Sequence, residues 1–549
     1  MKSSSYIIFA LLLLFSGCLS PEKARKKADD DAYGIIKEAQ VNIGASTGTA
    51  FSVERPADVL RRKLMIDQNL PSATNLTETS FTGTVVDLSV LDCLQIGARN
   101  NNTYQKTKED IFRAALAVDL LRYSFGTSYS GVLSGSYQSD HSEDNTSEEI
   151  SAGFETKVSR TLKNGAKLAG AISLDVVKLL TGDRDSAYGL LLDVSATIPL
   201  LRGAGRDVVL EPLTQAERDL FYALLHFERY RKSFTVQIAQ EFMRILQAAD
   251  SVLIAKDNLN RLERGFQRSK ELSEAGRLPK TELDQTEQDV LRARTRLVSA
   301  RQNEDALYDA FKSTLGLPVD ARIKLDDSIL KQLRLNTEEA LNEDDSIDIS
   351  QSVFIRRAFE SRLDLRVVLY RLEDSERKIM VAAADLKAGA ELTLSGSSRE
   401  RRNRGSNESE IHFNDGTYAA GLNVDLPWEM RDERNRYREA LMSAEDAKRA
   451  VEQKEDEIKA AVRSSIRRRI EAKETYRIQK TAVELAEHRV KSTEMFVESG
   501  RAKTRDVLEA QEALVNARSA LTDAVVSYHV ARWTLFRDIG ELRAGSLER

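Results

Sequence analysis

The sequence predicts a mainly α-helical protein in which pairs of β-strands interrupt long helices in two successive copies. Only 8 of the 549 residues are proline, far below the usual share of about 5%, and this scarcity favours extended helices. Two runs, 187–199 and 418–427, alternate apolar with polar residues, which is typical of a strand with one apolar face. A block near the C-terminus also repeats an earlier block at an offset of 224 residues, which indicates a duplication.

Composition and charge exclude several classes of function. The 81 Lys and Arg side chains nearly balance the 86 Asp and Glu side chains, for a net charge of −5, so the chain lacks the basic surface of a nucleic-acid-binding protein. Cys18 and Cys93 cannot form a disulfide framework, and the 5 histidines are scattered, so no metal site and no cofactor are predicted. Gly203-Ala204-Gly205 lacks the third glycine of a dinucleotide-binding loop, and we predict no enzyme activity.

The first residues predict a secretion signal. Lys2 precedes a short apolar run at 6–15, which has the length of a signal-peptide core and is shorter than the ~20 residues that span a bilayer. Ser16-Gly17-Cys18 follows and resembles the cleavage site of bacterial lipoproteins. We therefore expect a signal peptide at 1–17 and a lipid on Cys18, with an ordinary secretory signal as the alternative.

A polar tether and then a helix are expected after the signal segment. Residues 18–84 are polar and weakly patterned and are expected to form a tether and lead-in. Ser89, with Asp92 three residues later, predicts a capping box. The helix that it opens is expected to resume after a break at 100–102 and to end near Tyr123.

The pattern then changes to period two, and strands are expected between about 125 and 199. Four segments alternate, of which the first and last are the clearest: 125–137, 150–160, 167–178 and 187–199. Asn164-Gly165 is a suitable turn between the middle two. Whether this middle pair joins the same sheet is left open by the sequence.

Two helices complete the first copy. One is expected from about 212 to 275, and at 1.5 Å per residue it is roughly 95 Å long. A second is expected from about 280 to 315. A rod of this length needs neighbours along its whole length. The first copy therefore spans 85–317, and a linker is expected at 318–349.

The second copy, at 350–541, repeats this order. Strands are expected at about 389–397 and 418–427, and Pro427 ends the second of them as Pro199 ends its counterpart. A long helix is expected from about 433 to 498, followed by another that ends at Gly540, before a tail at 542–549.

The spacing of glycines supports the duplication. Gly276 and Gly316 are 40 residues apart, and so are Gly500 and Gly540. Under the common offset of 224, further residues coincide: Arg277 with Arg501, Ala293 with Ala517, Arg294 with Arg518, Leu297 with Leu521 and Ala300 with Ala524.

The strands predict a shared membrane barrel. Each clear strand has the length, about ten residues, of a tilted membrane strand. The two copies supply four clear strands, whereas the smallest membrane barrels need about eight. An open sheet edge in lipid leaves backbone groups without hydrogen bonds, at several kcal/mol each. Several chains must therefore contribute strands, and three chains would give twelve.

Several runs resemble the TolC family of outer-membrane factors over about residues 85–541. Pro199-Leu200-Leu201-Arg202-Gly203 is similar to the family's strand-end motif, and Arg362-Leu363-Asp364-Leu365 to its helix opening, although Leu363 stands where a proline is usual. The most specific run is Asp506 to Gln511, within the segment from Gly500 to Gly540.

The resemblance implies a fold, a function and partners. It implies a homotrimer with a twelve-stranded barrel in the outer membrane and an α-helical tunnel across the periplasm. Such a channel-tunnel is the exit duct of a tripartite efflux pump or of a type I secretion system. Its implied partners are a periplasmic adaptor, an inner-membrane transporter and outer-membrane lipid.

The resemblance also implies which residues serve the duct. Asp506 and Glu509 correspond to the acidic rings that narrow the periplasmic entrance, where carboxylates at a constriction attract cations. The turns at the tip, where adaptors dock, correspond to Gly276 with Arg277 and Gly500 with Arg501. The alternative for each of these charges is an ordinary solvated helix surface.

A pore-less alternative also fits part of the sequence. In the second long helix, Val451, Ile458, Val462 and Ile466 form a narrow apolar seam flanked by charge, which is typical of coiled coils. The rival interpretation is therefore a periplasmic coiled-coil structural lipoprotein. It does not explain why strand pairs interrupt the helices at equivalent places in both copies.

Overall fold

The computed structural model describes residues 20–43, 51–53, 60–68, 86–142, 145–179, 187–346, 351–399, 416–499 and 501–542. The expected signal peptide, Cys18 and Gly500 lie outside these residues. The chain forms two compact units. The sheet unit is drawn from Met1–Phe51, Asp110–Leu224 and Val367–Val451, and the helical unit from Ser52–Glu109, Leu225–Arg366 and Glu452–Arg549.

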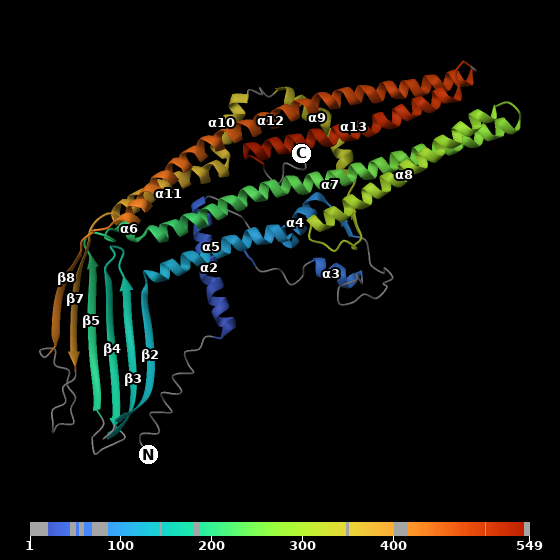
Figure 1. The fold of residues 1–549 in the computed structure, drawn as a ribbon. Helices are drawn as coiled ribbons and strands as arrows, with labels where there is room; N and C mark the ends of the chain where they lie inside the picture. Colours follow the sequence, from blue (N-terminus) through green and yellow to red (C-terminus); the bar gives the residue numbers. More distant parts are fainter. Residues whose placement is uncertain are drawn as a thin grey trace. The chain divides into compact units, whose positions relative to one another are not determined.

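A single antiparallel sheet of six strands lies in the sheet unit (Figure 1). In order across the sheet, the strands are β2 (Thr127–Ser142), β3 (Asn145–Thr161), β4 (Lys167–Leu179), β5 (Ala187–Pro199), β7 (Gly389–Arg399) and β8 (Thr417–Asp425). The middle pair that the sequence left open therefore forms β3 and β4, inside the sheet. Among the described residues, this sheet therefore has six strands, which is more than the four that each chain of a twelve-stranded trimer requires.

One face of the sheet is apolar across all six strands. The register places Leu133 beside Phe154, Phe154 beside Leu174, and Leu394 beside Ala196, and side chains two residues apart share a face. The apolar face comprises Tyr129, Leu133, Tyr137, Ile150, Phe154, Val158, Leu168, Ile172, Leu174, Leu192, Val194, Ile198, Leu392, Leu394, Tyr418, Leu422 and Val424. Most of these side chains are exposed in the single chain. The opposite face is mainly serine, threonine and carboxylate.

A helix packs where the sequence predicted only a tether. Residues 21–43, within the expected tether at 18–84, form α2 (Pro21–Ile43), and residues 60–67 form α3 (Leu60–Asp67). The stripe that α2 buries is short, with Ala32, Ile35 and Ile36 as its buried residues. Glu38 lies 3.1 Å from Arg122, which also pairs with Glu217 at 3.0 Å. Because α2 has so few apolar residues among so many charged ones, the sequence gives only a weak signal of an amphipathic helix.

Four long helices form two antiparallel hairpins, and their predicted ranges are confirmed to within two residues. They are α7 (Glu211–Glu274) with α8 (Lys280–Thr314), and α12 (Arg431–Glu498) with α13 (Thr504–Ile539). The short helix α6 (Arg206–Val209) precedes α7. The offset of 224 holds at the turns, because Glu274 maps onto Glu498 and Lys280 onto Thr504.

The helices before each strand group are duplicated as well. In the first copy, α4 (Val90–Asn100) and α5 (Asn102–Ser124) have 11 and 23 residues. In the second copy, α10 (Gln351–Ser361) and α11 (Leu363–Asp385) also have 11 and 23. The predicted capping box is present at the start of α4, where Ser89 and Asp92 exchange hydrogen bonds.

The segment expected to be a linker, 318–349, carries structure of its own. Strand β6 (Ile323–Leu325) pairs in parallel with β1 (Val86–Leu88), and α9 (Ser328–Ser346) follows. Thr337 of α9 lies within hydrogen-bonding distance of His529 of α13, 3.2 Å from its Nε2, and both side chains are buried. Among the described helices, none is both long and apolar enough to cross a bilayer.

Asp364 ties four helices together inside the helical unit. Its carboxylate accepts two hydrogen bonds from Arg362, at 2.7 and 3.0 Å, and lies 3.3 Å from Arg229 of α7 and 3.4 Å from Lys454 of α12. Arg362 also donates to the backbone carbonyl of Asp538 in α13. Burial alone would raise the pKa of Asp364, but the Arg362 hydrogen bond and the neighbouring cations outweigh it and hold that pKa at about 2.

Replacing Asp364 with asparagine is expected to lower the free energy of unfolding by about 2 kcal/mol at neutral pH. Because the folded-state pKa lies below the ordinary value, the contribution of Asp364 is present above about pH 4 and is lost as pH falls toward about 2. The difference between wild type and Asp364→Asn should therefore vanish in acid, as measured by urea unfolding with circular dichroism. The control is Asp456→Asn, whose side chain is 79% exposed and should change little. A pH-independent difference would contradict this role.

Two equivalent glycines follow the second helix of each hairpin, Gly316 after α8 and Gly540 after α13. Each lies in close contact with the end of another helix. Gly316 and Gly540 have φ values of 70° and 91°, which L side chains rarely adopt. A Cβ at Gly316 would lie 2.4 Å from the Asn100 carbonyl oxygen, and a Cβ at Gly540 would lie 2.9 Å from the Ser361 carbonyl oxygen. Glycine is therefore required at both positions for two reasons, backbone conformation and space.

Gly316→Ala and Gly540→Ala are each expected to destabilise the protein by roughly 1–3 kcal/mol, measured by the same urea unfolding. Gly276→Ala is the matched control, because Gly276 has a φ of 71° but no neighbour within 4 Å of its Cβ position. It should show the backbone penalty alone, about 1 kcal/mol. Equal effects at all three positions would contradict the close contact.

Candidate functional site

The turns at the ends of the two hairpins have the same backbone structure. The Arg277 N–H donates to the Leu272 carbonyl, and the Arg501 N–H donates to the Phe496 carbonyl, both at 2.8 Å. These donors and acceptors coincide under the offset of 224. Gly276 adopts the left-handed conformation that ends many helices, and its counterpart Gly500 lies outside the described residues. Arg277 and Arg501 are both exposed at these turns.

Equivalent ion pairs also join the helices within each hairpin. Arg294 of α8 lies 3.2 Å from Glu263 of α7. At the matching positions, Arg518 of α13 lies 2.8 Å from Glu487 of α12. An apolar cluster of Leu259, Val290, Ala293 and Leu297 holds the first hairpin beneath these charges.

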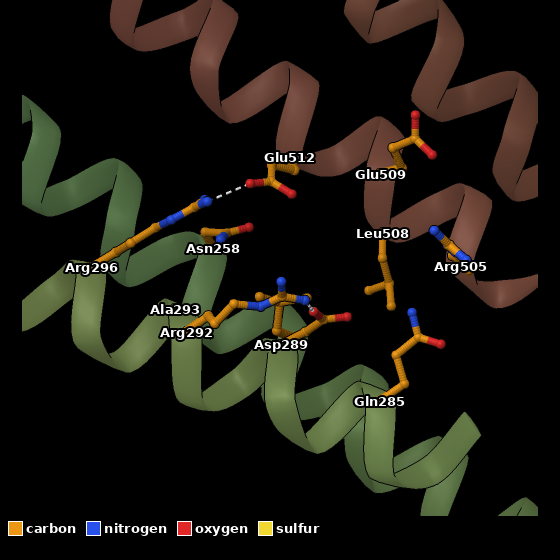
Figure 2. Close-up of a pocket in the computed structure, with 11 residues that line it drawn as sticks. Asn258, Gln285, Asp289, Arg292, Ala293, Arg296, Arg505, Leu508, Glu509 and Glu512 are labelled. Atoms are coloured by element: carbon orange, nitrogen blue, oxygen red, sulfur yellow. Dashed lines mark hydrogen bonds and ion pairs between the residues drawn. The ribbon is translucent and has the colours of Figure 1, made fainter. Parts of the chain in front are cut away.

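A polar cavity of about 280 Å³ lies between the first hairpin and α13 (Figure 2). Arg296 of α8 forms an ion pair with Glu512 of α13 at one side of the cavity. Gln285 and Arg505 line the cavity, as does Glu509. Charged and amide groups therefore dominate the wall, and the two hairpins are joined here by polar contacts.

Asp506 caps a helix in this structure. Its Oδ2 accepts a hydrogen bond of 2.9 Å from the Lys503 backbone N–H, at the start of α13. A carboxylate at this position satisfies one of the unpaired N–H groups of the first turn and interacts favourably with the helix dipole. Asp506 is otherwise exposed, so its charge remains accessible at the tip.

Glu509 lies one turn further along α13 and is paired. Its Oε1 is 3.3 Å from an Nη of Arg489 in α12. Arg489 was not predicted from the sequence, although Arg489 and Glu509 lie at equal distances along the chain from residue 499, at the turn. Helical hairpins place such residues side by side.

The first hairpin lacks this pair. Under the offset of 224, Arg489 corresponds to Gly265 and Glu509 to Gln285. The first hairpin therefore lacks both charges of the Arg489–Glu509 pair. By contrast, the Arg294–Glu263 pair of the first hairpin has an equivalent in the second, Arg518–Glu487. Among the described residues, no group of three or more His, Cys, Asp or Glu side chains is placed to hold a metal ion.

Comparisons with known proteins extend these observations. Residues 354–541 match the model of the family described as Outer membrane efflux protein. No curated protein sequence matches the chain.

Solved structures match over most of the chain. CusC, a protein described as undergoing transmembrane channel formation, matches at 14% identity with a TM-score of 0.57, over 89% of this chain and 98% of CusC. The CmeC outer membrane channel of Campylobacter jejuni matches at 13% identity with a TM-score of 0.58, over 83% and 88%. The open-state MtrE channel of Neisseria gonorrhoeae matches at 14% identity with a TM-score of 0.57, over 84% and 94%. Residues 354–541 therefore match the Outer membrane efflux protein family, and the chain has the fold of outer-membrane channels such as CmeC and MtrE.

Proposed function

We propose that three copies of this chain assemble in the outer membrane into the exit duct of a tripartite efflux pump or a type I secretion system. The observation that carries this proposal is the sheet, which has one exposed apolar face across all six strands and ends at β2 and β8. An apolar face suits lipid, but an open sheet does not, because its edge groups would lack hydrogen bonds there. Sharing strands between copies removes the edges.

The N-terminus supplies a second link to the membrane in this proposal. Removal of 1–17 and acylation of Cys18 would attach the chain to the outer membrane by a lipid. In this proposal the lipid holds the N-terminus at the membrane surface, and the sheet forms the wall that crosses the bilayer. The rival function, a periplasmic coiled-coil lipoprotein without a pore, would use the lipid alone.

The turns of the two hairpins are proposed as the docking sites of a periplasmic adaptor, which joins the duct to an inner-membrane transporter. Arg277 and Arg501 are exposed and equivalent in the two copies, and both hairpins have the same turn geometry. A partner with repeated acidic groups could therefore engage both turns in the same way. Co-purification of an adaptor and a transporter with the chain is the supporting result.

The duct proposal is tested by extracting the mature chain from outer-membrane fractions in detergent. We expect a trimer that separates into single chains only on heating and that conducts ions in planar bilayers, since a closed wall surrounds water. Recovery of a monomer that stays in aqueous solution without detergent and conducts nothing would support the pore-less lipoprotein instead.

Asp506 and Glu509 are proposed to narrow the periplasmic entrance. The double variant Asp506→Asn/Glu509→Gln should raise the conductance of the trimer in planar bilayers and lower its preference for cations. It removes the carboxylate charges from the constriction and breaks the Glu509–Arg489 pair between α12 and α13. Unchanged conductance would show that neither Asp506 nor Glu509 forms the constriction.

Two further variants separate the charge from the ion pair. Arg489→Gln keeps both carboxylates, Asp506 and Glu509, but breaks the Arg489–Glu509 ion pair. A rise in conductance without loss of cation preference would then show that this ion pair narrows the entrance. Glu282→Gln is the matched control, because Glu282 is the first-copy counterpart of Asp506. We expect a smaller change from it, since its neighbour Gln285 carries no charge.

A further inference from the structure

The strand pair β3–β4 is an addition to the first copy. In the second copy, α11 leads into β7 and β8 leads into α12, with one hairpin between the helices. In the first copy, α5 leads into β2 and β5 leads into α7, but β3 and β4 lie between them. Thus β2 and β5 occupy the places of β7 and β8, and among the described residues of the second copy, which omit 400–415, the β3–β4 pair has no counterpart.

The added pair is hydrogen-bonded into the sheet on both sides. The register of β2 with β3 is continuous from Thr127 opposite Arg160 to Ser142 opposite Asn145. That of β4 with β5 runs from Lys167 opposite Thr197 to Val177 opposite Ala187. The two strands have 17 and 13 residues, which exceeds the ~9–11 residues of a tilted membrane strand.

Strands β3 and β4 also continue both faces of the sheet, the apolar face and the polar face. Phe154 and Ile172 lie on the same face as Val194, and all three side chains are about half exposed, at 48%, 51% and 56%. On the other face, Glu155 lies opposite Ser173. A segment folded into a water-filled lumen would have no reason to continue the apolar face of the wall.

The turn between β3 and β4 is fitted to the strand-end motif of the first copy. The Leu162 N–H donates to the Ala166 carbonyl at 2.7 Å, and Ala166 is buried. Gly165 has a φ of 93°, and a Cβ there would lie 2.8 Å from the Gly203 carbonyl oxygen and 2.9 Å from Pro199. The hairpin is thus fixed in place at its helix-side end.

We propose that β3–β4 lies in the wall of the duct, so that three chains of six strands close a pore of eighteen strands rather than twelve. This inference rests on the proposed function. Barrel diameter grows about linearly with strand number, so the barrel is about one and a half times as wide as a twelve-stranded one. Its wide, polar mouth admits water-soluble polymers that a twelve-stranded mouth excludes.

The test uses a deletion designed from the register. Ser136 lies opposite Ser151, Ser151 opposite Val177, and Val177 opposite Ala187, so Ser136 and Ala187 are level across the sheet. Removing 137–186 and joining Ser136 to Ala187 through Asn-Gly leaves a single hairpin of β2 and β5, with the turn that such hairpins favour. A control replaces only 180–186 with Asn-Gly.

Two measurements decide the matter. Electron cryo-microscopy of the wild-type trimer in detergent should resolve eighteen strands, and the deletion variant should have twelve. In planar bilayers, polyethylene glycols of graded size are added only on the side opposite the tip. The largest polymer that lowers conductance should be smaller in radius by about a third for the deletion variant and unchanged for the control.

The inference would be overturned if the wild-type trimer had twelve strands, or if the wild type and the deletion variant had the same polymer limit. Either result would leave the proposed function as a duct standing. Absence of a conducting trimer would overturn the proposed function instead. Where the deletion variant does not assemble, the strand number of the wild type decides alone.

Discussion

The need of every backbone N–H and C=O for a hydrogen bond is the constraint on which the architecture depends. Within the described residues, β2 and β8 each have a neighbour on one side only, and the face that they border is apolar. In water this face would be a large exposed apolar patch, and in lipid the two edges would cost several kcal/mol per unpaired group. A single chain satisfies neither solvent, which is why the proposed assembly follows from the sheet itself.

Duplication has preserved backbone geometry more strictly than charge. The paired helices have the same lengths, the hairpins turn at the same offset, and Gly316 and Gly540 meet a carbonyl oxygen in the same way. The charges differ, because Arg489 and Glu509 have Gly265 and Gln285 as counterparts. Helix ends and close backbone contacts tolerate few residue types, whereas an exposed helix surface tolerates many. The difference between the copies therefore lies where function can vary without altering the fold.

The sequence predicted the elements whose signals are local. Glycine and proline marked the ends of α7, α8, α12 and α13, and strict alternation identified β5, β7 and β8. The sequence did not predict α2, because its three buried residues among many charges form too narrow an apolar stripe. It also did not predict α9, which lies in the segment expected to be a linker. The position of β3–β4 between β2 and β5 was also beyond local signals, since strand pairing depends on residues far apart in the chain. For the same reason Arg489, which is 20 residues from Glu509, was not identified.

The two kinds of ion pair in the helical unit imply a gradient of stiffness. Arg362 and Asp364 are 5% and 16% exposed, so their attraction is little screened by dissolved salt. Arg489 and Glu509 are 54% and 65% exposed, and a pair of this kind contributes at most about 1 kcal/mol, less as ionic strength rises. Thermal motion alone can part such a pair many times a second. The chain thus combines a buried ion pair at Asp364, which resists separation, with an exposed ion pair at Glu509, which breaks and re-forms by thermal motion without the supply of metabolic energy.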